Sequence, residues 1–564
     1  MSSSPDTATL HRGFITIQGA FGTRQVHYRR GGRGPVVLLL HQSPQSSREM
    51  EPLIEAWGNA FTLIAPDSPG YGFSQPLQRA GQPAAGASME DFASATLEFV
   101  DALGIGRFGI YGFHTGASIG TALAEARPDR VAAVAANGLV VLTEAERATI
   151  LRDYLPPLVP RWDGGHLAWL WARVREQAIF FPWHDRRAAT RMDFDVPPAD
   201  RLQSGLLEFL AAGDQYHVAY AGAFVDRAER RLPALPVPLL VTAQARDPLA
   251  GHLARIGPRS ASVRVETAAD TAAALASAFA HLESHPGDTA PPPRATAAPT
   301  GSTLPVSAYL GAPRRQIRVL RQSLRAPGHP PAGCPTVILL HAPGSSATAL
   351  GALTHDIAGH AVVVTPDLPG HGASDAPPAT AEPGATLDSV VTQLAGALAP
   401  EVAAARTTVV VVVAIGASAP VASELARRLG PDTGVLRLQP PSWSAADTEE
   451  WLKVGLPALA PVWSGGHLLE AWHMVRDGRL YSPWFRRAHA GIRAGEPDLD
   501  DRGIHRDVVD HLRANGTWQA LLRDALLHRR PPGTGEPLSI DMPGVPASWA
   551  DVLRQAADRR AASS

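Results

Sequence analysis

Cysteine and lysine are almost absent from this chain of 564 residues. Cys334 is the only cysteine, so no intrachain disulfide, thiolate zinc site or iron–sulfur cluster can form. Lys453 is the only lysine, which excludes Schiff-base chemistry from the first half of the chain. No group of histidine, aspartate and glutamate residues has metal-ligand spacing, so the sequence predicts no metal site.

Long apolar runs and an excess of one charge are also missing. No stretch approaches the ~20 apolar residues of a membrane span, and Thr407 to Ile415 is long enough only for a buried strand. Met1 to Leu10 is polar and lacks the apolar core of a signal peptide, so we expect a cytoplasmic protein. A formal net charge of −2 without a basic stripe argues against nucleic-acid binding. The expected partner is therefore a small molecule, and neither a nucleic acid nor a membrane.

The sequence contains no convincing nucleotide-binding motif. Gly104-x-Gly106-x-x-Gly109 matches the dinucleotide fingerprint as a string, but it precedes its strand and leads into no helix. A phosphate-binding loop ending in Gly-Lys-Ser/Thr is absent. We expect no cofactor.

The chain repeats itself. VVLLLHQSPQSS (36–47) is similar to TVILLHAPGSS (336–346), and LIAPDSPGYGFS (63–74) to VVTPDLPGHGAS (363–374). WDGGHLAWLW (162–171) is similar to WSGGHLLEAW (463–472). The three offsets are 300, 300 and 301, so the sequence predicts a tandem duplication.

Strands and helices alternate within each copy, as in an α/β fold. Copy one predicts strands near 14–20, 26–31, 36–41, 61–66, 107–112, 131–137, 238–243 and 262–267 and helices near 48–58, 89–103, 115–126 and 270–283. We expect a first domain over 12–284 with a helical cap at about 141–233, a Pro/Ala-rich linker over 285–314, and a second domain over 315–560 with a cap at about 443–530. The second copy is expected to be truncated: LSIDM (538–542) allows one more strand, and no final strand–helix unit follows it.

The order of motifs resembles the α/β-hydrolase superfamily, in particular its capped branch of epoxide hydrolases, haloalkane dehalogenases and ester or carbon–carbon bond hydrolases. The resemblance is carried by His-x-x-Pro after one strand, Asp-x-Pro-Gly-x-Gly-x-Ser after the next, a strand–turn–helix elbow, a helical cap, and a strand followed by Arg-Asp. It implies two mostly parallel sheets flanked by helices, each with a cap, and a site at the carboxyl ends of the strands.

The resemblance also implies a serine nucleophile in a Gly-x-Ser-x-Gly elbow, which both copies lack. The first elbow reads Gly112-Phe113-His114-Thr115-Gly116, with His114 at the nucleophile position. In the second copy, Gly416 takes that position and Ser418 lies two residues later, where it should point along the helix.

The remaining members of a catalytic triad are only partly present. Asp247 follows the strand after the cap, where the family places its acid, but no histidine follows the last strand. His252 lies on the preceding loop and His281 belongs to the last helix, so a Ser-His-Asp triad is absent.

An anion site remains possible in copy one. The helix that begins at Thr115 favours negative charge at its first turn, and the family's oxyanion hole would here use the N–H groups of Gln42 and Thr115. His114 as acid/base and Asp247 as its orienting carboxylate would complete a proton-transfer site. Three interpretations stay open: a hydrolase-like enzyme, a cofactor-free lyase, decarboxylase or oxygenase, and a pseudoenzyme whose elbow is a relic turn in a ligand-binding or interaction scaffold.

Other candidate residues surround this site. His41 and Trp183 are predicted to line the pocket, although His41 and its counterpart His341 are more typical of residues that hydrogen-bond a loop backbone. The cap tryptophans are also typical of packed cores. Because both copies keep their cap motifs, we expect the copies to pack on one another as an internal pseudo-dimer.

Overall fold

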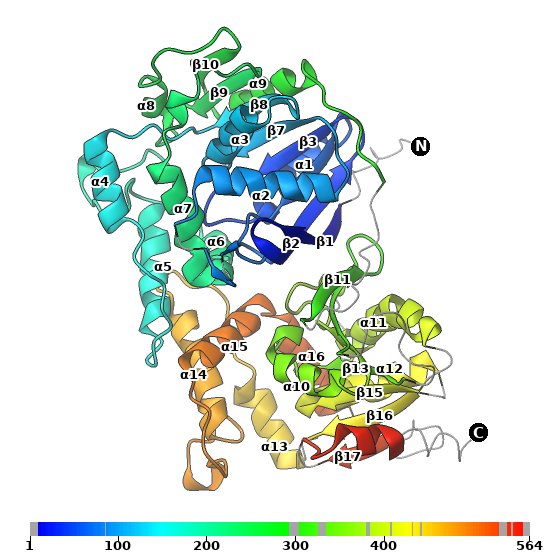
Figure 1. Cartoon of the computed structure of the whole chain (residues 1–564). Coiled ribbons are helices and arrows are strands. Elements are labelled where there is room, and N and C mark those ends of the chain that lie inside the picture. Colours follow the sequence, from blue (N-terminus) through cyan, green and yellow to red (C-terminus); the bar gives the residue numbers. More distant parts are fainter. Residues whose placement is uncertain are drawn as a thin grey trace, which may run out of the picture. The chain divides into compact units, whose positions relative to one another are not determined.

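The computed structural model describes residues 10–79, 81–84, 86–292, 304–324, 334–378, 384–405, 409–430, 433–439, 443–528, 539–542 and 545–555. These residues form two compact units (Figure 1). The first unit contains the described residues up to Val159 and those from His166 to 292. The second contains Pro160–Gly165 and the described residues from 304 onward.

The first unit is built on an eight-stranded sheet in the order β1-β2-β4-β3-β7-β8-β9-β10. β2 pairs antiparallel with β1 and β4, and the other neighbours are parallel. The strands are β1 (His11–Gly19), β2 (Gly22–Gly32), β3 (Val36–Leu40), β4 (Thr62–Pro66), β7 (Phe108–Phe113), β8 (Val131–Asn137), β9 (Leu239–Gln244) and β10 (Val263–Ala268), and β5 (Gln78–Arg79) and β6 (Gln82–Pro83) form a separate pair. The predicted strands of copy one are therefore confirmed.

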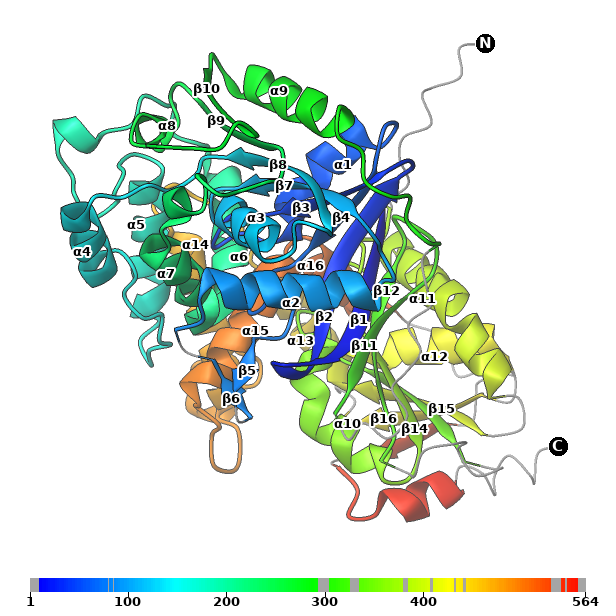
Figure 2. The same cartoon turned by 45° about the horizontal axis from the view of Figure 1, so that its top comes forward.

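Helices cover both faces of this sheet, as its continuously apolar strands require (Figure 2). One face carries α2 (Met89–Ala102) and α3 (Thr115–Ala126), and the other carries α1 (Glu51–Trp57) and α9 (Thr271–Glu283). On the second face, residues of α1 and α9 pack with Val37 and Leu39 of β3.

A helical cap lies between β8 and β9, where the sequence predicts it. Its elements are α4 (Glu144–Asp153), α5 (Gly165–Gln177), η2 (Ala188–Thr190), α6 (Ala199–Ala212), η3 (Gly213–Gln215), α7 (Tyr216–Val225) and η4 (Ala228–Arg230). The short helices η1 (Ser47–Met50) and α8 (Ala250–Leu253) follow β3 and β9. Because β3, β4, β7, β8 and β9 are parallel, the loops after them share one edge of the sheet.

The second unit repeats this plan with a seven-stranded sheet in the order β11-β12-β14-β13-β15-β16-β17. Its strands are β11 (Val306–Leu310), β12 (Ile317–Gln322), β13 (Thr336–Leu340), β14 (Val362–Pro366), β15 (Val410–Ile415), β16 (Thr433–Leu438) and β17 (Ser539–Met542). Its helices are η5 (Ala347–Leu350), α10 (Gly351–Ala358), α11 (Ala385–Ala404), η6 (Gly416–Ser418), α12 (Ala419–Leu429), α13 (Ala445–Glu450), the π-helix η7 (Trp451–Gly455), α14 (Gly466–Leu480), η8 (His489–Gly491), α15 (Asp501–Arg513) and α16 (Thr517–Leu527).

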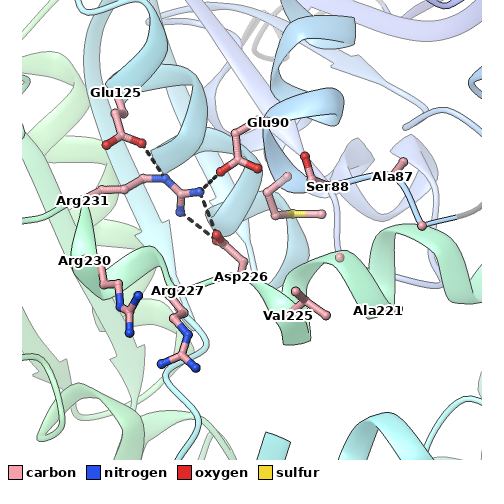
Figure 3. Close-up of a pocket in the computed structure, with 13 residues that line it drawn as sticks. Ala87, Ser88, Glu90, Glu125, Ala221, Val225, Asp226, Arg227, Arg230 and Arg231 are labelled. Atoms are coloured by element: carbon pink, nitrogen blue, oxygen red, sulfur yellow. Dashed lines mark hydrogen bonds and ion pairs between the residues drawn. The ribbon is translucent and has the colours of Figure 1, made fainter. Parts of the chain in front are cut away.

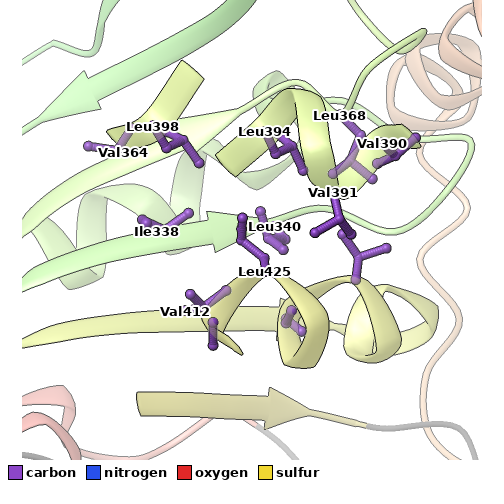
Figure 4. Packing of buried hydrophobic residues seen from close by; sticks show 14 of the residues in the cluster. Ile338, Leu340, Val364, Leu368, Val390, Val391, Leu394, Leu398, Val412 and Leu425 are labelled. Carbon is purple, nitrogen blue, oxygen red and sulfur yellow. The ribbon is translucent and has the colours of Figure 1, made fainter. Parts of the chain in front are cut away.

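The core of the second unit lies between the sheet and helices α11 and α12. Figure 4 shows Val390, Leu394 and Leu398 of α11 beside Ile338 and Leu340 of β13. All five side chains are buried. The sheet therefore has a packed apolar face of its own, as an independent unit requires.

Two expectations at the domain ends need correction. Strand β11 falls inside the segment predicted as a linker over 285–314. At the other end of that segment, the Asp288 carboxylate accepts from the N–H of Arg107 at 2.7 Å. Both ends of the predicted linker are thus paired with sheet residues, and 293–303 lies outside the described residues.

The carboxyl-terminal part of the second unit also differs from the expectation. Strand β17 pairs in parallel with β16, as LSIDM (538–542) suggested. It is followed by a helix over 549–555, although the sequence predicted no further strand–helix unit. Trp549 and Leu553 of this helix join a second buried cluster with Val337 and Leu339 of β13, on the other face of the sheet. The described residues end at 555, so the predicted truncation stays a prediction.

Candidate active site

The predicted elbow forms at the junction of β7 and α3. His114 adopts φ 47° and ψ −106° as the residue before α3. A side chain on Gly112 would lie 2.3 Å from the carbonyl oxygen of Gly116, and one on Gly116 would lie 2.1 Å from that of Leu40. Both glycines are therefore required by close backbone approach, and the turn holds His114 in a conformation that few side chains adopt.

The structure brings His114 and Asp247 together. Nε2 of His114 lies 3.1 Å from Oδ2 of Asp247, whose other oxygen accepts from the N–H of Leu249 at 2.8 Å. The Asp247 side chain is 5% exposed and that of His114 is 21% exposed. Burial acts to raise the pKa of Asp247, but the hydrogen bond and charge of His114 outweigh it, so the pKa lies below its ordinary value. Asp247 is thus an ionised partner for the imidazole.

This contact defines the tautomer of His114. Because Nε2 faces a carboxylate that only accepts, Nε2 carries the proton. Among the described residues, Nδ1 has no hydrogen-bond partner, so its lone pair is available. The Phe113 ring lies against the imidazole with 4.2 Å between ring centroids and limits its rotation. The pair is a base with a fixed orientation.

The site also contains Glu49, which no motif in the sequence identifies as a site residue. Its carboxylate accepts from the backbone N–H of Gln42 at 3.2 Å and from the Gln42 side-chain amide. Burial raises the pKa of Glu49 to about 7, against the lowering effect of these bonds and of His114. A carboxyl group that exchanges its proton near neutral pH therefore lies close enough to His114 for their charges to interact.

A local signal for Glu49 exists, but it points to a different role. Ser46-Ser47-Arg48-Glu49 matches the pattern of a capping box, in which the glutamate bonds the first residue of the motif. In the structure Ser46 does cap the short helix η1, whereas Glu49 turns to Gln42 instead. The pattern identifies a helix start and gives no indication of an acid at the site.

The two predicted oxyanion donors differ. Thr115 is the first residue of α3, where a backbone N–H has no acceptor within the helix. The N–H of Gln42, by contrast, already donates to Glu49. The prediction for Gln42 needs correction, because the carboxylate of Glu49 occupies the place that a substrate oxygen would take.

The structure places His41 and Trp183, both predicted to line the pocket, as buried side chains with hydrogen-bonded rings. The His41 ring is 1% exposed: Nδ1 bonds the carbonyl of Gln42 at 2.8 Å, and Nε2 accepts from the N–H of Ser68 at 2.9 Å. Both ring nitrogens are used to join the loops after β3 and β4. The Trp183 ring is buried in the cap core, and its indole N–H donates to the carbonyl of Tyr154 at 3.0 Å.

The second unit has a turn at the matching place but no reactive side chain on it. Gly416 follows β15 with φ 55°, and a side chain added there would meet no described atom within 4 Å. Ser418 is fully buried, and its hydroxyl bonds the backbone of Ile415 and Leu340. Ser418, which the sequence predicts to point along the helix, thus has its hydroxyl bound to the backbone of the turn and of β13.

A separate hollow of about 480 Å³ lies at the other end of α3 from His114. Figure 3 shows Arg231 at its centre, between Glu90, Glu125 and Asp226. The Arg231 side chain is 7% exposed, and these carboxylates satisfy its charge. Arg231 and these carboxylates form an ion-pair network that joins α2, α3 and the end of the cap. The hollow contains none of the predicted site residues.

None of the helices in the described part of the chain combines the length and the apolar character needed to cross a membrane.

Residues 35–169 match the family model of the alpha/beta hydrolase fold. The chain is 30% identical over 130 residues to an (E)-2-((N-methylformamido)methylene)succinate hydrolase of Acinetobacter baylyi, which is 23% of this chain and 47% of the relative. It is 35% identical over 111 residues to haloalkane dehalogenase 2 of Mycobacterium tuberculosis, covering 20% and 37%. A soluble epoxide hydrolase of a Corynebacterium species is 27% identical over 202 residues, covering 33% and 62%. The chain thus spans less than two thirds of each of these relatives.

Proposed function

Because its first unit places this chain in the α/β-hydrolase superfamily, we propose that this unit is a small-molecule hydrolase in which His114 replaces the serine and activates water. The observation that carries the proposal is the 3.1 Å contact between Nε2 of His114 and Oδ2 of Asp247. It orients the imidazole and leaves Nδ1 as a base at the place where the family positions its nucleophile.

With an ester as substrate, Nδ1 of His114 takes a proton from water while the water oxygen bonds to the carbonyl carbon, and the N–H of Thr115 binds the oxyanion. When the carbon–oxygen bond breaks, the leaving oxygen takes the proton of Glu49. His114 then returns its proton to Glu49 through solvent, which restores both groups. A base and an acid whose environments set different pKa values are the arrangement that such a step needs.

The same residues support a second candidate, proton transfer to and from a carbon acid without attack by water. Glu49 favours this alternative, because a carboxyl group with a pKa of about 7 can return the proton that His114 removes. A lyase or decarboxylase of this kind would share the machinery and differ only in the substrate.

For the second unit we propose a non-catalytic role within a tandem duplication. Gly416 supports this role, since it offers no side chain at the turn. The duplication is supported by His341, which bonds the carbonyl of Ala342 and the N–H of Leu368 just as His41 bonds Gln42 and Ser68, 300 residues earlier. Truncation of this copy, its packing on the first, and a cytoplasmic location stay predictions.

The test is a screen of activated esters, epoxides and carbon acids with the full chain and with His114→Ala. We expect the variant to lose at least about a hundredfold in kcat/KM. His473→Ala, which changes an exposed histidine of α14, is the matched control and should keep full activity. Activity that is indifferent to His114→Ala would exclude the assignment.

Mass spectrometry of the protein during a single turnover separates the two ways in which His114 could act. Direct attack by water forms no covalent adduct, whereas ¹⁸O from labelled water would enter the acid product by either route. Mass spectrometry that finds an acyl group on His114 would contradict water activation and make His114 the nucleophile.

A further inference from the structure

Cap helix α6 lies over the loop that follows β3. A side chain on Gly205 of α6 would lie 3.7 Å from Nε2 of Gln45 in that loop. Glu208 follows Gly205 by three residues and therefore projects from the same face of the helix. This places a cap carboxylate next to the loop that carries Gln42 and Glu49.

The electrostatic effects of Glu208 agree with this position. Its charge contributes to raising the pKa of Glu49 on one side of the loop and counters the lowering of the pKa of His41 on the other. Glu208 itself is half-buried, and it has no hydrogen bond or ion pair to any described residue. Glu208 is therefore a carboxyl group on the loop-facing side of α6 without a partner among the described residues.

The second unit supplies independent support for this geometry. LLEFLA (206–211) of α6 corresponds to VVDHLR (508–513) of α15, which aligns Glu208 with Asp510. The Asp510 carboxylate accepts from the hydroxyl of Ser346, in the loop after β13, at 2.7 Å. A carboxylate at this helix position thus reaches the corresponding loop directly.

Carboxyl groups from three different segments lie at the candidate active site. Glu49 lies in η1, Glu208 in α6 and Asp247 in the loop after β9. The side chains that act most strongly on the pKa values of Glu49 and Asp247 are His114, Gln42, Glu208 and His252, with no arginine among them. A cationic group of a substrate would find a carboxyl group at Glu208 that has no partner among the described residues.

We propose that Glu208 selects substrates with a cationic group, such as a primary or quaternary ammonium, placed beside the bond that the water activated by His114 attacks. For turnover this inference rests on the proposed hydrolase function, but binding of the cation does not. Glu208 is then a specificity-determining residue of the cap, and the substrate class is a small ammonium compound with a hydrolysable bond.

Binding is tested first, with choline, its uncharged isostere 3,3-dimethylbutanol, and succinate as the anionic probe. Calorimetry on the full chain should show choline binding at least about tenfold more tightly than the isostere and succinate not binding at the same concentrations. Glu208→Gln should remove the preference for choline, while Glu283→Gln, an exposed glutamate at the end of α9, should keep it. Equal affinities for the two probes, or a preference that survives Glu208→Gln, would overturn the inference.

Turnover is tested with acetylcholine and 3,3-dimethylbutyl acetate, which differ only in the charged atom. We expect at least about a tenfold higher kcat/KM for the cationic ester, and a ratio near one in Glu208→Gln. Hydrolysis of both esters at equal rates would overturn this inference and leave the hydrolase proposal standing. Choline binding that depends on Glu208, with neither ester hydrolysed, would support this inference and count against the hydrolase.

Discussion

Gly138 and His114 are in such close contact that only glycine fits beside the imidazole. A Cβ atom on Gly138 would lie 2.2 Å from Cδ2 and 2.7 Å from Nε2 of the His114 ring. Gly138 directly follows β8 and has φ 75°, while His114 directly follows the neighbouring strand β7. The position of the imidazole is therefore fixed by a residue outside the elbow itself.

Gly138→Ala should displace the ring of His114 from Asp247 and reduce kcat by at least about tenfold. Folding should lose only about 1 kcal/mol, the ordinary cost of alanine at a positive φ, because the ring can turn outward. Gly251→Ala is the matched control, since a methyl group there meets nothing within 4 Å. Steady-state kinetics and thermal unfolding measure the two effects. Unchanged kcat with a large loss of stability would contradict the positioning role.

Asp247→Asn should reduce kcat about 10²–10⁴-fold through the tautomer of His114. The N–H of Leu249 donates to one oxygen of Asp247, so the amide oxygen of asparagine should stay at Leu249. Its NH₂ group then faces Nε2 of His114, which must accept, and the proton moves to Nδ1. Steady-state kinetics with NMR of the imidazole nitrogens checks both parts. A variant that keeps the proton on Nε2 yet loses activity would assign Asp247 another role.

Glu49→Gln should change how both activity and stability depend on pH. In the wild type, kcat should fall as pH rises through about 7, because Glu49 loses the proton it donates. The variant should be slower and lack this alkaline limb. A pH–kcat profile tests this, and an unchanged limb in the variant would assign it to another group.

The stability effect of Glu49 has the opposite sign to that of an ordinary surface carboxylate. The folded chain holds this proton up to pH about 7, whereas the unfolded chain releases it near the ordinary value of 4.5. Stability therefore falls as pH rises between these values. Glu49→Gln should remove this loss and stabilise the first unit at pH 8 by at most about 3 kcal/mol, with no gain below pH 4. Thermal unfolding at both pH values measures the difference.

Arg231→Met should destabilise the first unit by about 3 kcal/mol. Arg231 bonds both oxygens of Asp226, at 2.9 and 2.7 Å, and the Asp226 side chain is only 6% exposed. Without the arginine this carboxylate is buried and unpaired. Glu125→Gln, which changes a half-exposed partner of the same arginine, should cost less than about 1 kcal/mol. Urea unfolding compares the two, and equal costs would contradict this explanation.

The order of strands and the place of the site could be predicted from sequence because both follow from periodic apolar runs. Once β3, β7, β8 and β9 run parallel in one sheet, the residues after them must share an edge, which is why His114 after β7 and Asp247 after β9 meet. The elbow could also be predicted, because Gly112 and Gly116 are needed where backbone segments approach each other closely.

Side-chain direction at that edge could not be predicted in the same way. A tryptophan such as Trp183 is equally typical of a pocket wall and of a packed core. Only the structure shows that Trp183 packs with Tyr154 in the cap core. Glu49 satisfies a helix-capping pattern, so its turn toward Gln42 has no separate signal in the sequence. The sequence around Asp288 is rich in Pro and Gly, which is the composition of a linker, yet the carboxylate and the backbone of Asp288 hydrogen-bond Arg107 and Val36.

His41 and His341 give the two units a shared sensitivity to acid. Burial lowers the pKa of both rings, and each must stay neutral because its Nε2 accepts an N–H from the loop after the next strand. Below pH about 6.5 these histidines bind a proton in the unfolded chain but stay neutral in the folded chain. Both units therefore lose stability over the same pH range. Mild acidification should therefore loosen the loops that His41 and His341 hold together, in both units over the same pH range.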